Sequence, residues 1–179
     1  MRIRFLVCGI TAILGLVLSG CVSSDKRADM DMQDAAGHAD EIMDATLASI
    51  DPVVQWAHGP TTTGSCAVTR RRAVMTIVSD GRRGSFLGLV ERAWRKRDYR
   101  IKGVNNDRDS PAIYAQSGGG FGVSLVFGGG QAFFEVDSPC VEESDVAEST
   151  TPPNGPSYEG VYPLPRPNVR SDFWSAGAP

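Results

Sequence analysis

Four β-rich segments joined by short turns constrain the fold of this chain most strongly. They are YRIKGV (99–104), AIYAQS (112–117), FGVSLVF (121–127) and QAFFEV (131–136). Three glycines separate the second segment from the third, and three more separate the third from the fourth. Strands joined by so few residues run antiparallel, because a parallel connection needs about a dozen residues or more. The sequence therefore predicts a four-stranded antiparallel meander.

One further strand and one helix precede the meander. The stretch CAVTRRRAVMTIVS has β-branched and apolar residues, and its apolar second half is typical of a central strand. The next stretch, SDGRRGSFLGLVERAWRKRDY, predicts a helix with one apolar face, made of Phe86, Leu89, Val90, Ala93 and Trp94. A helix set apart from a run of consecutive strands indicates the α+β class. We expect residues 66–140 to pack one helix on a five-stranded sheet.

Acidic or irregular segments flank this domain. Residues 29–51 repeat apolar side chains at three- and four-residue steps opposite a face of acids, which predicts an amphipathic helix ending before Pro52. Residues 52–65 are expected to form a linker. Residues 141–179 are rich in proline, serine, glycine and acids, a composition typical of a disordered tail. Isolated aromatic residues in this tail leave open that it docks on a partner or on the domain.

The first 20 residues have the parts of a secretory signal. Two arginines precede an uncharged, mostly apolar run from Phe5 to Leu18, and the small residues Ser19 and Gly20 follow it. The run is shorter than the ~20 residues that a membrane-spanning helix needs. We therefore expect residues 1–20 to be removed on export.

The end of this segment, Leu18-Ser19-Gly20-Cys21, resembles the lipobox of bacterial lipoproteins. That resemblance implies that Cys21 becomes the first residue and carries a diacylglyceryl group, with residues 21–28 as a tether on the extracytoplasmic face of the cell membrane. Two or more acyl chains hold a protein firmly in a bilayer. The order of elements, with the SGGGFGVSLVF hairpin and a terminal SPC, is also similar to small actinobacterial lipoproteins of unassigned function.

The chain has four cysteines, and the lipobox resemblance accounts for two of them. Cys8 leaves with the signal, and Cys21 is blocked by lipid. Cys66 and Cys140 remain as an even pair in an exported chain, which favours a disulfide over two free thiols. Neither lies in a CxxC motif and both histidines are remote in sequence, so no metal site is expected.

Basic residues concentrate in the middle of the chain. Residues 66–140 carry twelve basic and seven acidic side chains, whereas residues 21–65 carry two and eight, and residues 141–179 carry two and six. One basic group is the run Arg70 to Arg72. The others lie at the two ends of the expected helix: Arg82, Arg83, Arg92, Arg95, Lys96 and Arg97.

These helix residues form a candidate anion-binding surface for lipid headgroups or acidic envelope polymers. Two alternatives stay open: an ordinary solvated helix face, and a surface masked by the acidic helix at 29–51. Nucleic acid is not expected as the partner of an exported chain.

No motif predicts catalysis or a cofactor. The GGGFGV stretch does not complete GxGxxG, and neither GK[ST] nor GxSxG occurs. Asp107 and Asp109 lack the spacing of a calcium-binding loop. We expect a non-enzymatic interaction or structural module at the cell envelope. The alternatives are an uncharacterised hydrolase and a carrier of small apolar ligands, whose cavity would be lined by Phe86, Trp94, Tyr114 and Phe127.

Overall fold

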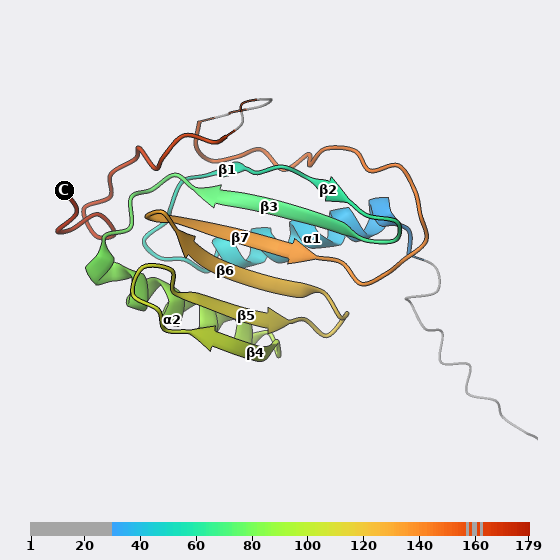
Figure 1. Ribbon diagram of the computed structural model, residues 1–179, viewed down its shortest axis with the longest axis horizontal. Coiled ribbons are helices and arrows are strands. Elements are labelled where there is room, and N and C mark those ends of the chain that lie inside the picture. Colours follow the sequence, from blue (N-terminus) through green and yellow to red (C-terminus); the bar gives the residue numbers. More distant parts are fainter. Residues whose placement is uncertain (1–29, 157, 159–160, 162) are drawn as a thin grey trace, which may run out of the picture.

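The computed structural model describes residues 30–156, 158, 161 and 163–179. It contains two helices, α1 (Met32–Leu47) and α2 (Asp80–Lys96), and one seven-stranded antiparallel sheet (Figure 1). The strands are β1 (Trp56–His58), β2 (Thr62–Thr63), β3 (Val68–Val74), β4 (Arg100–Asn105), β5 (Ala112–Gln116), β6 (Gly122–Gly128) and β7 (Gln131–Asp137). The sheet order is β1-β3-β7-β6-β5-β4, and β2 also pairs with β3. The α+β class and the antiparallel meander β4 to β7 are confirmed.

The segment expected as a linker instead contributes two strands, so the sheet has seven strands rather than five. Trp56 pairs with Val74 and His58 with Arg72, and the short β2 pairs with the beginning of β3. Trp56 and Ala57 are buried. A strand of three residues is too short for its alternation to be recognised in the sequence.

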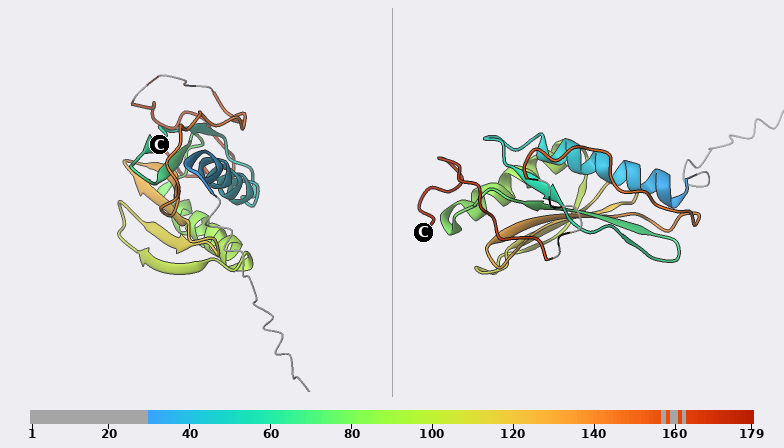
Figure 2. Two further views of the ribbon diagram at one scale, coloured as in Figure 1. Left: turned by 90° about the vertical axis from the view of Figure 1, so that its right-hand side faces the viewer. Right: turned by 90° about the horizontal axis from the view of Figure 1, so that it is seen from above.

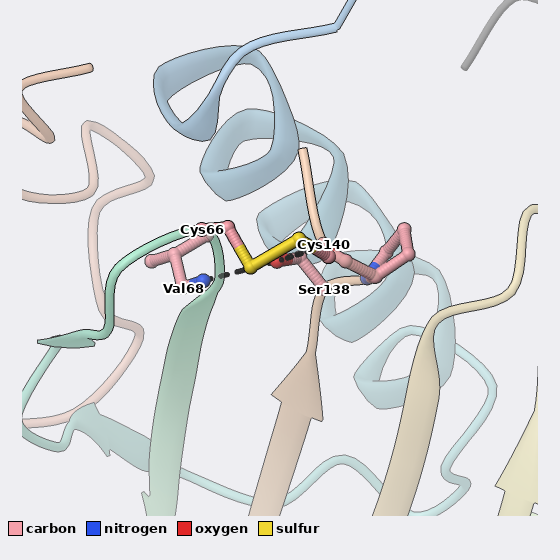
Figure 3. Close-up of a disulfide and its surroundings, with 5 residues drawn as sticks. Cys66, Val68, Ser138 and Cys140 are labelled. Atoms are coloured by element: carbon pink, nitrogen blue, oxygen red, sulfur yellow. Dashed lines mark hydrogen bonds between the residues drawn. A yellow bond between two sulfur atoms is a disulfide. The ribbon is translucent and has the colours of Figure 1, made fainter. Parts of the chain in front are cut away.

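The first and last strands of the expected domain, β3 and β7, are neighbours. Their register runs from Thr69 opposite Asp137 to Ala73 opposite Phe133. This register brings Cys66 and Cys140 together as a disulfide, with their Cα atoms 4.8 Å apart (Figure 3). The Ser138 hydroxyl accepts a hydrogen bond from the Val68 amide beside the disulfide. The expected pairing of these two cysteines is confirmed.

Both helices lie on the same face of the sheet, so the acidic helix belongs to the domain and does not stand apart from it (Figure 2). Helix α1 packs on β3 and β7, and α2 packs on β4 and β5. Helix α1 is shorter than the expected span of 29–51. It begins at Met32 because the Asp31 side chain caps its start, accepting a hydrogen bond from the Asp34 amide at 2.8 Å. The indole of Trp94 donates to the Thr46 hydroxyl at 3.0 Å and joins the two helices.

The C-terminal segment is packed against the domain where the structure describes it, which corrects the expectation of a disordered tail. Trp174 is 1% exposed, and its ring centroid lies 5.1 Å from that of Phe86 in the core. Its indole donates to the Pro52 carbonyl at 2.6 Å. Val169 forms a parallel bridge with Thr76. One buried indole anchors this segment, although its composition is that of a disordered chain.

The expected signal segment and Cys21 lie outside the described residues. Within the described part, neither helix has an apolar stretch of the length that crossing a membrane requires.

Candidate anion-binding surface

Two of the three strand arginines, Arg70 and Arg72, are buried in ion pairs with the acidic helix, whereas Arg71 is partly exposed and pairs with Glu135 of β7. Arg70 is 3% exposed and Arg72 is fully buried. The Arg72 Nη1 lies 2.5 Å from the Asp44 carboxylate, and Asp40 lies between both guanidinium groups at 3.4 and 3.5 Å. Arg72 also stacks on the Trp56 ring, 4.1 Å from its centroid. Helix α1 therefore masks Arg70 and Arg72, and these two are unavailable to a partner, but it does not cover the helix residues of the candidate surface.

The two arginines at the start of α2 are half-buried in local contacts. Arg82 lies over the Phe173 ring at 4.2 Å. Arg83 pairs with Asp80 at 2.6 Å and lies over Phe127 at 5.6 Å. About nine residues of helix, or roughly 14 Å, separate them from the next basic residue, Arg92. The six residues expected to form one surface are therefore split into two groups.

The second group is larger than the sequence indicated. The last turns of α2 carry Arg92, Arg95, Lys96 and Arg97, and the edge strand β4 adds Arg100 and Lys102 two and four residues after the turn at Asp98. All six side chains are exposed. We call this set the basic end. The sequence analysis missed the last two residues because their run was assigned only as a strand.

Few acids neutralise the basic end. Among the described residues, its single ion pair joins Arg95 to Glu91 at 2.7 Å. Arg97 donates to the Ala45 carbonyl at 2.8 Å, which fixes the end of α2 against α1, and Arg100 donates to the Gln116 side chain at 2.8 Å. Position favours these cations, because positive charge at the last turn of a helix complements the helix dipole. Charge on an edge strand also prevents that strand from pairing with another chain.

A shallow depression of about 440 Å³ lies between the C-terminal ends of α1 and α2. Arg92, Lys96 and Arg97 line it together with Ser49, Leu89 and Ala93. A second depression, of about 290 Å³, lies on the other side of the turn and is lined by Arg100, Asp98 and the residues around Ser117. The basic end therefore offers cations beside hollows wide enough for a phosphate or carboxylate group.

A group of acids lies towards the other edge of the sheet, beside β3 and away from β4. Glu142, Glu143, Asp145 and Glu148 are exposed on the segment that follows β7, and we call them the acidic segment. Arg70 donates to the Ala147 carbonyl at 2.6 Å, and the Ala147 amide donates to Gln33 of α1 at 2.7 Å. These bonds hold the acidic segment beside α1 and β3, whereas the basic end lies at the β4 edge (Figures 1 and 2).

The other candidates from the sequence have local structural roles. Asp107 accepts hydrogen bonds from the amides of Asp109 and Ser110 and from the Ser110 hydroxyl. These bonds hold the pKa of Asp107 below its ordinary value, and the bond from the Ser110 amide contributes most. No group of three or more potential metal-ligating residues occurs in the described ranges.

The residues expected to line an apolar cavity do not form one. Phe86, Trp94 and Phe127 are fully buried, and Phe86 contacts the rings of Phe127 and Trp174 at 5.8 and 5.1 Å. Tyr114 is 43% exposed, with buried neighbours on either side in β5, so its side chain lies on the opposite face of the sheet. The expected carrier cavity is therefore corrected: three of its four residues fill the core.

Comparison with known proteins does not assign the chain to a family. No family model matches the chain, and no curated protein matches its sequence. A similar solved structure is the crystal structure of a DUF4853 family protein from Actinomyces odontolyticus. It is 11% identical, the match covers 78% of each chain, and the TM-score is 0.34.

Proposed function

We propose that this protein is a lipoprotein on the extracytoplasmic face of the cell membrane, where it is a non-enzymatic interaction module that binds an anionic partner through its basic end. The observation that carries the proposal is the contrast between two sets of arginines. Arg70 and Arg72 are buried in ion pairs, whereas six cations within residues 92–102 are exposed and share a single ion pair among the described residues. Exposed, unpaired cations attract anions, while buried pairs do not.

The location rests on the N-terminal sequence. A lipid on Cys21 would hold the mature chain at the membrane, and residues 22–30 would link it to α1. Replacing Cys21 with alanine should move the protein from the membrane fraction to the soluble fraction after cell lysis and signal removal. Continued retention at high salt of a Cys21→Ala chain that mass spectrometry shows to be unlipidated and to lack residues 1–20 would contradict the anchor.

The non-enzymatic role is supported by the places of the nucleophile and base candidates. His38 lies 3.2 Å from Glu41 with its ring 4.8 Å from that of Phe121, and His58 bonds the Thr151 carbonyl at 2.8 Å. Cys66 and Cys140 are joined in the disulfide. Among the described residues, neither histidine is therefore bonded to the serine or cysteine that nucleophilic catalysis needs.

Binding of a soluble polyanion tests the anion-binding role. The mature chain with Cys21→Ser should bind dextran sulfate, and the affinity should fall steeply with salt because exposed charges are screened. Each cation near an anionic surface contributes about 1 kcal/mol, so the variant Arg92→Glu/Lys96→Glu/Lys102→Glu should bind at least about 100-fold more weakly.

The matched control removes the same charge elsewhere. Arg108, Arg166 and Arg170 are exposed outside the basic end. Their reversal to glutamate gives the same net charge but leaves the basic end unchanged. We therefore expect this control variant to lose far less affinity for dextran sulfate. Equal losses in the two triple variants would show a net-charge effect and would contradict a defined surface.

A further inference from the structure

We infer that the basic end docks on the same anionic leaflet that holds the lipid anchor, so that the domain rests on the membrane by its β4 edge with the acidic segment pointing away. This inference rests on the proposed function and names the partner of the same surface: anionic phospholipid in the protein's own bilayer. Three features of the structure carry it: the reach of the tether, the separation of the charges and the shape of the basic end.

The tether is long enough for this contact. Arg97 bonds the Ala45 carbonyl, which is thirteen residues along the helix from Met32, so the basic end lies about 20 Å from the beginning of α1. The nine residues from 22 to 30 can span about 30 Å when extended. An anchor on Cys21 therefore allows α1 to begin above the bilayer while the basic end touches it. The same tether raises the effective concentration of the basic end at the membrane to about the millimolar range.

The acidic segment does not cancel this attraction. Arg70 of β3 holds the acidic segment, and four strand spacings of ~4.8 Å, about 19 Å, separate β3 from β4. This separation exceeds the screening length of ~8 Å at physiological ionic strength. A bilayer at the β4 edge therefore meets the cations, and the acids favour the orientation in which they point away from it.

The arrangement of the cations fits an extended surface. They come from two elements that meet at one edge, the end of α2 and the strand β4, and they flank two shallow depressions, not one enclosed pocket. Arg92, Lys96 and Arg97 line a depression that also contains Leu89 and Ala93. A phosphate headgroup can lie among these three cations while neighbouring headgroups meet Arg100 and Lys102.

The lysines of the chain report directly on this contact. Lys96 and Lys102 belong to the basic end, and the third lysine, Lys26, lies in the tether. The lipidated full chain would be placed in vesicles of phosphatidylcholine alone or of phosphatidylcholine with phosphatidylglycerol, and amine labelling would be followed by mass spectrometry. With phosphatidylglycerol, Lys96 and Lys102 should label several-fold more slowly, and high salt should restore their rates. Carbodiimide labelling of Glu148, which is 89% exposed, should not change.

A variant that keeps both lysines tests whether their protection depends on the other charges of the basic end. Arg92→Glu/Arg100→Glu should abolish the protection, whereas Arg108→Glu/Arg166→Glu should retain it. Equal labelling of Lys96 and Lys102 in the two kinds of vesicle would overturn this inference. If the same chain then still bound dextran sulfate, a soluble envelope polymer would be the partner and the proposed function would stand. If it bound neither, both proposals would fail.

Discussion

The packing of Trp174 predicts that one residue near the C-terminus holds a large share of the stability of the domain. Trp174 is 1% exposed, lies against Phe86 and donates to the Pro52 carbonyl. Replacing a buried tryptophan with alanine costs about 3–5 kcal/mol, because it removes apolar contact and leaves a cavity. Since small domains have about 5–15 kcal/mol of stability, Trp174→Ala should remove about a fifth of it or more.

Urea unfolding followed by far-ultraviolet circular dichroism measures this loss. With a urea dependence of about 2 kcal/mol per molar, the midpoint should fall by about 2 M. The control is the adjacent Phe173, which is 39% exposed and contacts Arg82 from the surface. Phe173→Ala should lower the free energy of unfolding by about 1 kcal/mol or less, as surface changes do. Equal midpoints for the two variants would refute the packing of the tail and restore the expectation of a disordered one.

Three further predictions concern the disulfide, the buried ion pairs and one carboxylate. Replacing Cys66 and Cys140 with serine should lower the free energy of unfolding by about 4.5 kcal/mol in the chain-entropy model, because the bridge closes a loop with a sequence separation of 74; an unchanged urea midpoint would contradict it. Asp40→Ala should destabilise the domain by about 3 kcal/mol or more in the same assay, because it leaves buried guanidinium charge underpaired. Removal of Glu91, which pairs with the exposed Arg95, should cost less than about 1 kcal/mol. Nuclear magnetic resonance titration should find the pKa of Asp107 below its ordinary value. The stabilisation from its loop is then complete above the unfolded-state pKa and lost as the pH falls through the folded-state pKa, and an ordinary pKa would refute the hydrogen bonding described above.

The parts of the fold that follow local rules could be predicted from the sequence. Glycine turns between β-rich runs specify hairpins, and the spacing of Phe86, Val90 and Trp94 specifies the face of α2 that the core buries. The disulfide could be predicted because only two cysteines remained after the lipobox resemblance. These features depend on residues near one another or on a small number of alternatives.

The features that the sequence did not predict depend on contacts between distant residues. Trp174 packs on Pro52 and Phe86, and no periodicity around an isolated tryptophan predicts that. Arg70 and Arg72 looked like part of a charged run, but two acids of α1 pair with them. The enlargement of the basic end did leave a signal in the sequence: Arg100 and Lys102 alternate directly after the basic turns of α2.

The docking of the C-terminal segment also determines where its acids lie relative to the basic end. A flexible acidic chain attached after β7 could swing to the β4 edge and neutralise the basic end, and at short range such a tethered contact would have a high effective concentration. Arg70 and Gln33 bond Ala147 and hold the acids on the β3 side, and Trp174 anchors the end of the same segment in the core. By bonding Ala147, the buried Arg70 holds the acidic segment away from the exposed cations of the basic end.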